Sequence, residues 1–344
     1  MESLGWKQLN RAVLARQLLL ERSRLPLYRV VERMAGVQAQ YIPSAYVGVW
    51  SRTEGFTRDT LTGALQRGSV IQGTLMRGTI HLVSRADYWP IAAAIRDLMR
   101  QWWLRVDRSG RSAEEMEELA GRLRFVLADG PKRRAELVDE LGIDNTAWNG
   151  VGYWVELVRV PPSGTWESRR ADLYGLATEW VGPDGADASS GAEHLVRRYL
   201  AGFGPASRED IKSFTGFGLA EVDQILVRLP GRRFADENGG MLVDVSGAPL
   251  PDPGAPAPVR FLGTWDASLL VHSRRAQILP EEYRGRIFHT RAPHSFNTFL
   301  VDGQVAGTWR EEGGEIRLEP FHPIPSRFRR ELEQESERLA ALFD

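Results

Sequence analysis

The sequence predicts an α+β fold that is mainly helical, and three observations support this prediction. Apolar residues recur at helical spacing over long stretches of the chain. Three successive segments each end in two strand-like runs around a turn, and a Pro- and Gly-rich spacer precedes a β-rich end. A helix-turn-helix followed by a hairpin is the layout of a winged helix. We therefore expect three tandem winged-helix units, a small C-terminal β-rich element and a terminal helix.

The first unit is expected over residues 1–87. Alternation of apolar and polar residues over Val70–Val83 predicts a hairpin centred on Met76-Arg77-Gly78. Residues 41–46 are expected to form a loop. The helices are predicted at Trp6–Leu20, Leu27–Ala35 and Asp59–Gln66.

The second unit is expected over residues 88–190. Gly130-Pro131 and Gly142 mark the start and the end of one of its helices. Two strands around Pro162-Ser163-Gly164 would form its hairpin, and a Gly- and Asp-rich linker follows at 181–191. The helices are predicted at Ile91–Val106, Ala113–Leu127, Lys132–Leu141 and Trp148–Arg159, and the strands at Val160–Trp166 and Leu173–Ala177.

The third unit, expected over residues 191–247, carries the clearest local signals. Ser207-x-x-Asp210 is a capping pair that starts a helix, and Glu237-Asn238-Gly239-Gly240 predicts a hairpin turn. The helices are predicted at Ala192–Leu200, Arg208–Phe214 and Leu219–Leu229, and the strands at Arg232–Phe234 and Met241–Val245.

Residues 248–344 are expected to form a different kind of region. The stretch Ser246–Pro258 predicts an extended spacer, Asp302-Gly303 predicts a hairpin turn, and residues 292–297 are expected to form a loop. The strands are predicted at Arg260–Gly263, Phe299–Val301, Gln304–Trp309 and Ile316–Leu318, and a charged helix at Ser326–Leu342.

Charge leaves nucleic-acid binding open. The formal net charge is −1, from 44 basic and 45 acidic residues. Almost all the basic residues are arginines that cluster, as in Arg96–Arg111 and Arg122–Arg134, so a neutral total can still present a basic face to a polyanion. Arginines on solvated helix faces would produce the same composition.

Composition also argues against several classes of site. The chain has no cysteine, which excludes disulfides and thiolate metal ligands, and its six histidines lack metal-ligand spacing. No apolar run approaches the length of a membrane span, and the N-terminus has no signal-peptide pattern. We therefore expect a cytoplasmic monomer that needs no metal and no cofactor.

The segment Gly36-Val37-Gln38-Ala39-Gln40-Tyr41 is the most informative stretch. In a continuing helix, Gln38 and Gln40 would point about 200° apart, whereas in an extended chain their amides would share one face. Such a pair can hold a water or a sugar oxygen, but neither amide takes a proton at neutral pH. Taken alone the motif is weak, because Gln-x-Gln often arises by chance and a solvated helix end is its more common explanation.

Three motifs in one order make the pattern specific. They are Gln38-x-Gln40, the hairpin Thr74–His81 and the late run Trp265–Arg275. Together they resemble the winged-helix DNA glycosylases of the AlkZ-like family over nearly the whole chain. The resemblance implies three winged helices around a DNA channel, double-stranded DNA carrying an alkylated guanine as partner, and hydrolysis of the N-glycosidic bond of N7-alkylguanine without a cofactor.

The resemblance also implies roles for the two glutamines. One branch of the family carries Gln-x-Gln and another Gln-x-Asp, and the first is often associated with self-resistance to a DNA-alkylating natural product. An N7-alkylated base leaves as a neutral molecule, so cleavage needs no general acid. Gln40 is expected to orient the attacking water and Gln38 to hold it as a second acceptor.

The same resemblance suggests residues that contact DNA. Arg77, Gly78 and Thr79 at the hairpin tip are expected to brace the duplex, and His81 lies two residues on, on the face of Thr79. In the late motif we expect Trp265 and Leu269–Val271 in the core, and Asp266 to cap a helix or brace an arginine. Further candidates for contact with phosphate are His272, Arg274, Arg275, Arg133, Arg134, Arg208 and Lys212.

Two other interpretations stay open at this point. A winged-helix transcriptional regulator would bind an undamaged operator, although such proteins usually have one DNA-reading unit and a dimer interface. A non-catalytic adduct-binding protein would recognise alkylated DNA without releasing a base. Trp102 and Trp103, which lie among arginines, could line a groove, although large aromatic residues are more often part of the core.

Overall fold

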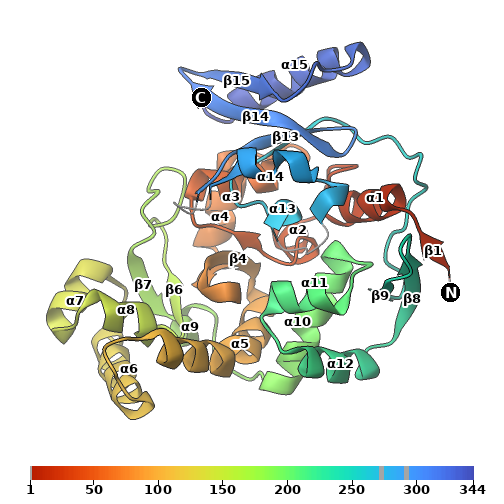
Figure 1. The fold of residues 1–344 in the computed structure, drawn as a ribbon. Coiled ribbons are helices and arrows are strands. Elements are labelled where there is room, and N and C mark those ends of the chain that lie inside the picture. The colour runs from red at the N-terminus through yellow and green to blue at the C-terminus, as the bar shows by residue number, and fades with distance from the viewer. Residues whose placement is uncertain (1, 271–274, 290–293) are drawn as a thin grey trace.

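The computed structural model describes residues 2–270, 275–289 and 294–344 (Figure 1). The fold is mixed α/β, with the long helices on the outside of short sheets (Figure 1). This confirms the predicted mainly helical class. In Figure 1 the C-terminal strands and the last helix lie above the three helical segments that precede them.

The first segment contains one helix that the sequence did not reveal. The expected loop at residues 41–46 is wrong, because Ile42–Trp50 forms helix α3. Every residue of α3 is buried, so its sequence lacks the polar stripe by which an amphipathic helix is recognised. The elements are β1 (Ser3–Leu4), α1 (Trp6–Arg16), α2 (Leu27–Arg33), β2 (Val37–Gln38), α3, α4 (Arg58–Gln66), β3 (Val70–Thr74), the 3₁₀ turn η1 (Met76–Gly78) and β4 (Ile80–Ser84).

The second segment departs from the prediction at its hairpin. The predicted helix Trp148–Arg159 is wrong beyond Val151, since Leu157–Arg159 is strand β6 and pairs with both β3 and β7. The predicted strand Val160–Trp166 is wrong as well, and the cis Pro161-Pro162 pair follows β6. The elements are α5 (Arg85–Val106), α6 (Ala113–Leu127), β5 (Lys132–Arg133), α7 (Arg134–Leu141), α8 (Asn145–Val151), β6, β7 (Leu173–Leu176) and α9 (Ala177–Trp180).

The third segment agrees with the prediction. The Ser207 hydroxyl accepts from Asp210 N, and the Asp210 carboxylate accepts from Ser207 N, which is the expected capping box. Gly216 ends the helix with φ +83°. The elements are α10 (Ala188–Phe203), α11 (Arg208–Thr215), α12 (Leu219–Arg228), β8 (Gly231–Asp236) and β9 (Met241–Val245).

The C-terminal region has the predicted strands and terminal helix, after a spacer at 246–258 that has no regular structure. The expected loop at residues 292–297 is wrong at His294–Ser295, which form a strand, and residues 292 and 293 lie outside the described residues. Its elements are β10 (Arg260–Leu262), α13 (Ala267–Leu270), η2 (Arg275–Gln277), α14 (Glu281–Ile287), β11 (Phe288–His289), β12 (His294–Ser295), β13 (Thr298–Val301), β14 (Gln304–Glu312), β15 (Glu315–Pro320) and α15 (Ser326–Ala340).

Sheet pairing joins segments that lie far apart in the sequence. The first two hairpins share one six-stranded sheet in the order β2-β4-β3-β6-β7-β5. Strand β1 pairs in parallel with β8 of the third hairpin, and β10 joins β13, β14 and β15. The first two hairpins are therefore parts of one surface rather than independent wings.

Buried ion pairs connect segments that lie far apart in the sequence. Arg16 of α1 forms a two-pronged pair with Asp244 of β9, at 2.5 and 2.9 Å. Arg52, just after α3, forms a second two-pronged ion pair with Asp266, with both distances 2.9 Å. The Asp266 carboxylate also accepts from Ser268 N. This confirms that Asp266 braces an arginine and caps a helix.

Candidate active site

The two motif glutamines lie beside the first hairpin, Gln38 at the end of strand β2 and Gln40 in the bend that follows. Helix α2 ends at Arg33, and the left-handed residues Ala35 (φ +56°) and Gly36 (φ +87°) turn the chain away from it. Gln38 then pairs with His81 of β4, and Ala39 N donates to Ile80 O at 2.7 Å. Strand β2 ends at Gln38 and the chain bends at Gln40, so the expectation that both amides share one strand face stays a prediction.

Gln38 lies next to a half-buried cation. Its Oε1 accepts from Arg77 Nη2 at 3.5 Å, and the same Arg77 nitrogen lies 3.4 Å from His81 Nε2. Arg77 Nη1 donates to Phe214 O of α11 at 3.0 Å, and the guanidinium lies over the Phe214 ring. Burial lowers the pKa of Arg77 to about 10, so the group remains a cation at neutral pH.

The ion pairs and hydrogen bonds of the described chain give this cation no carboxylate partner. The tip of the first hairpin is thereby fixed against the third segment through Arg77. Arg77 itself has left-handed backbone, with φ +58°. The expected contact of Arg77 with a DNA phosphate stays a prediction, and in the structure its guanidinium serves to hold Gln38 and α11 together.

His81 is a neutral neighbour of this cation. Its side chain is 2% exposed, and its Nδ1 lies 3.0 Å from Thr79 O. A carbonyl only accepts, so Nδ1 carries the proton and Nε2 accepts from Arg77. Burial, and secondarily the Arg77 charge, lower the pKa of His81 to about 3. His81 is therefore no acid or base near neutral pH.

Gln40 has a different partner from Gln38. Its Oε1 accepts from Ile80 N at 2.7 Å, which extends the ladder between the two strands by a side chain. The Gln40 side chain is exposed and lines a cavity of about 270 Å³. One lone pair of Oε1 and both amide protons remain available to a bound water or substrate.

The other residues of the hairpin tip have local structural roles. Gly78 has φ +67°, and a Cβ there would lie 2.8 Å from the Tyr153 hydroxyl, so glycine permits this close approach. The Thr79 hydroxyl donates to Met76 O at 3.1 Å. The predicted roles of Gly78 and Thr79 in DNA contact remain predictions.

Three of the remaining predicted phosphate contacts are bonded to partners within their own segments. Arg133 pairs with Asp172 at 2.8 Å, Arg134 donates to Asn145 at 2.6 Å, and Arg208 pairs with Asp223 at 2.8 Å. Lys212 is exposed on α11. His272 and Arg274 lie outside the described residues, and so does the side chain of Arg275.

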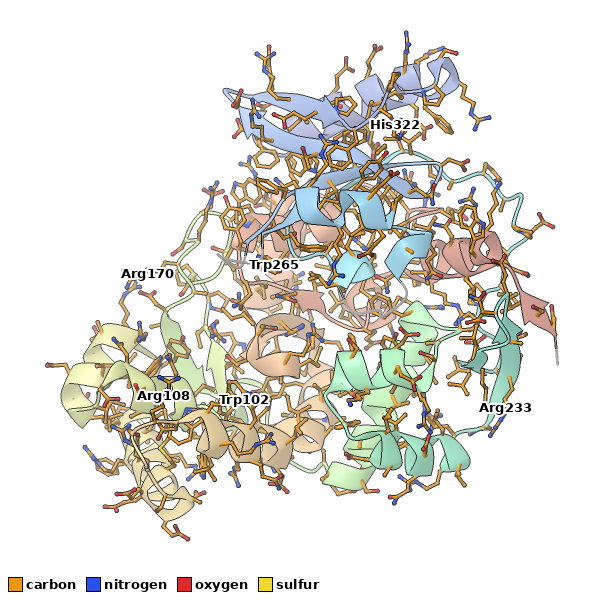
Figure 2. All side chains as sticks on the ribbon, viewed as in Figure 1. Trp102, Arg108, Arg170, Arg233, Trp265 and His322 are labelled. Carbon is orange, nitrogen blue, oxygen red and sulfur yellow. The ribbon has the colours of Figure 1, made fainter. Side chains whose placement is uncertain are left out.

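The predictions for the tryptophans and for the apolar residues of the late motif have different outcomes. Trp103 is 4% exposed and packs edge-on against Trp154, whereas Trp102 is 43% exposed near the end of α5 (Figure 2). Leu269 is buried as expected, Val271 lies outside the described residues, and Trp265 is half-buried (Figure 2).

Sequence reasoning missed Arg159, which lines the same cavity as Gln40. The predicted helix Trp148–Arg159 put this arginine in the wrong element. Gly150 and Gly152 signal a helix end, and the proline pair after Arg159 signals the end of a strand. Those signals, read together, would have placed a charged residue inside a sheet.

Comparison with known proteins decides the family. A family model described as DNA glycosylase AlkZ-like matches residues 31–342. The chain belongs to the AlkZ-like DNA glycosylase family. As a member of this family it is a DNA N-glycosylase, and its substrate is DNA.

Two further comparisons agree with this assignment, and both lead to Streptomyces sahachiroi. An interstrand DNA cross-link repair glycosylase of that organism is 24% identical over 92% of this chain and 91% of its own length. The solved structure of the DNA glycosylase AlkZ matches the fold with a TM-score of 0.83 at 21% identity, covering 99% of this chain and 97% of that one. The fold of this AlkZ-like chain is thus that of a solved glycosylase.

Within the parts of the chain that the structure describes, no helix is long and apolar enough to cross a membrane. The same residues contain no group of three metal-ligating side chains.

Proposed function

We propose that this glycosylase hydrolyses the N-glycosidic bond of N7-alkylguanine in duplex DNA, with Gln38 and Gln40 holding the attacking water. The observation that carries the proposal is the chemistry around Gln38. Its neighbours are an arginine that stays charged and a histidine that stays neutral, so these groups offer positioning and hydrogen bonds rather than proton transfer.

Such a site suits a base that leaves without help. Alkylation at N7 puts a positive charge on guanine, and bond cleavage moves that charge to the sugar. A water held by amide oxygens near C1′ can then attack, and its orientation is the main requirement. Gln40 would orient this water through the free lone pair of Oε1, while Gln38, steadied by Arg77, would hold it from the second side.

The same chemistry limits the substrate range. A carboxylate at the position of Gln40 would stabilise the sugar cation and take a proton, whereas an amide does neither. We therefore propose that uncharged, normal bases are not excised. The cross-link repair name of the Streptomyces relative supports cross-links as substrates. We propose in addition that the lesions are bulky adducts or cross-links of a DNA-alkylating natural product, with self-resistance as the role. Since Gln38 and Gln40 come from one chain, we also propose that a monomer acts.

The test is base release by wild type and by the Gln38→Ala/Gln40→Ala double variant. The substrates are duplexes with N7-methylguanine or with a bulky N7-guanine adduct, and alkali converts the abasic sites to strand breaks. We expect the single-turnover rate to fall by about 100-fold or more, with the DNA dissociation constant changed less than about 3-fold. A Gln66→Ala/Gln101→Ala double variant, which changes two exposed glutamines elsewhere, is the matched control.

Each other outcome has a definite meaning. Equal loss of binding and of excision would remove the catalytic assignment of the two glutamines. Binding to alkylated DNA without base release by wild type would favour the non-catalytic adduct-binding alternative. Binding to one undamaged operator sequence would favour the regulator, an alternative that family membership already makes weak.

A further inference from the structure

The cavity beside Gln40 is a second feature of this region. Its volume is about 270 Å³, and it lies between the first hairpin, helix α8 and strands β6 and β7. Its walls include the rings of Trp148, Tyr153 and Tyr174, and its polar lining includes Gln40 and Arg159. Aromatic walls with a few convergent polar groups are typical of a small-molecule site.

Arg159 lines this cavity, and its hydrogen-bonding capacity is only partly satisfied. Its side chain lies in the sheet with the residue 7% exposed, and Nη2 donates to Thr74 Oγ1 at 3.1 Å. Its Nε and Nη1 are buried and have no hydrogen-bond partner. Burying donors without acceptors is costly, so a ligand acceptor that meets Nη2, or that reaches Nε or Nη1 after a turn of the guanidinium toward the cavity, would bind favourably to this group.

Other buried arginines show what Arg159 lacks. Arg16 faces Asp244, Arg52 faces Asp266, and Arg260 lies 4.0 Å from Glu335. No ion pair of the described residues gives Arg159 such a carboxylate, and its guanidinium lies 5.1 Å above the centre of the Tyr174 ring. The cavity therefore keeps a positive charge that the protein does not neutralise.

The positive charge of Arg159 and the aromatic rings that line the cavity together determine which class of ligand fits. Trp148 and Tyr174 meet edge to face at 5.1 Å, and such rings favour a planar partner. A cationic ring is repelled by Arg159, which disfavours the N7-alkylated guanine itself. A neutral or anionic aromatic group that carries a carbonyl or carboxylate oxygen meets both requirements.

We propose that this cavity binds a planar, acceptor-bearing part of the DNA adduct, of the class of aromatic amides or carboxylates, with Arg159 donating to its oxygen. The inference rests on the proposed glycosylase function, because the adduct must be anchored at the guanine that Gln40 faces. The cavity would then set which bulky adducts are preferred, while Gln38 and Gln40 act at the sugar.

The first test measures selectivity between two matched adducts. Duplexes carry N7-benzylguanine or N7-(4-carboxamidobenzyl)guanine, which differ only in the amide. We expect wild type to process the amide adduct roughly tenfold more efficiently in kcat/KM, and Arg159→Met to lose this preference. Arg159→Lys should retain part of it, because an ammonium still donates to the amide oxygen.

Arg260→Met is the matched control for burial. Arg260 is also 7% exposed on a strand, but it lies outside the cavity. We expect this variant to lose thermal stability and to keep the preference for the amide adduct. An equal preference in wild type and Arg159→Met, or the same change in Arg260→Met, would overturn the proposal.

The second test does not depend on excision. Wild type, Arg159→Met and Trp148→Phe are titrated with benzamide and with benzoate while tryptophan fluorescence is recorded. We expect a saturable change in wild type, a roughly tenfold weaker one in Arg159→Met, and a smaller amplitude in Trp148→Phe. Saturation by inorganic phosphate but not by benzamide would overturn the proposal in favour of a backbone-phosphate site.

The two tests separate the two ways of failing. If wild type releases no alkylated base yet binds benzamide through Arg159, the proposed glycosylase substrate is wrong and the cavity assignment stands. If excision proceeds and neither benzamide nor benzoate binds, the cavity assignment is wrong.

Discussion

The first and third hairpins share one local pattern and differ in what holds them. The tip of the first hairpin is fixed by Arg77, whose guanidinium reaches Gln38, His81 and the carbonyl of Phe214. The third hairpin is fixed at its base, where Asp244 pairs with Arg16 and Arg232, and its tip at 237–240 is exposed.

This difference shows that an arginine in a hairpin has no fixed role. Arg77 is half-buried and bonded to two other elements, whereas Arg233 is exposed on the third hairpin (Figure 2). A polar side chain becomes part of an active site when neighbouring elements enclose it and supply partners. The third hairpin has the exposure expected of a surface contact, and the first has the enclosure expected of a reaction site.

The largest expected effect tests the base of the third hairpin. Asp244→Ala leaves Arg16 as a buried cation without its partner, which should lower the free energy of unfolding by about 3–5 kcal/mol. Asn238→Ala at the exposed tip should change it by less than about 0.5 kcal/mol. Urea unfolding followed by circular dichroism measures both, and equal losses would show that the base is not the anchor.

The next effect tests the tip of the first hairpin. Arg77→Met removes charged hydrogen bonds to Gln38 and α11, so excision of N7-methylguanine should slow by roughly ten- to a hundred-fold. Arg233→Met on the third hairpin should leave the single-turnover rate within about twofold of wild type. If both variants lose activity equally, or if the unfolding midpoint of Arg77→Met falls below the assay temperature, the assigned positioning role fails.

The smallest effect concerns His81. Its pKa lies near 3 in the folded protein, against about 6.5 in an unfolded chain, so the folded state favours the neutral ring. Its contribution to stability is complete above about pH 6.5 and is lost progressively as the pH falls towards 3. Between pH 6.5 and roughly 8, His81 should therefore produce no titration in the excision rate.

Histidine NMR signals followed from pH 8 downward check this expectation directly, together with a pH profile of excision corrected for spontaneous base loss. A His81 signal that titrates near pH 6.5, with the excision rate following it, would make His81 the general base and contradict the neutral assignment.

Prediction from sequence succeeded where the signal was local. The capping pair Ser207–Asp210 and the turn at Gly216 set helix α11, because caps act within one turn of the chain. Prediction failed where long-range contacts determine the secondary structure. Leu157–Arg159 forms a strand because β3 and β7 offer hydrogen bonds on both sides. Helix α3 was missed because all its residues are buried, so its sequence has no polar stripe.

The candidate site was likewise predictable only in part. Its glutamines were visible as a motif, and its hairpin was visible from alternation and a glycine turn. The residues that contact these glutamines and this hairpin could not be predicted from the sequence. The contact of Arg77 with α11 crosses 137 positions of the chain, and the place of Arg159 beside Gln40 depends on a shared sheet.

The sequence by itself determined the mainly helical class, the repeated helix-and-hairpin order and the chemistry of two amides, since spacing, caps and turn residues act locally. Only the tertiary structure decided that Gln38 meets a half-buried cation and a neutral histidine, and that Arg159 lines a cavity without a carboxylate partner among the described residues. Burial and charge are properties of the assembled surroundings, and the residues that supply them come from elements far apart in the chain.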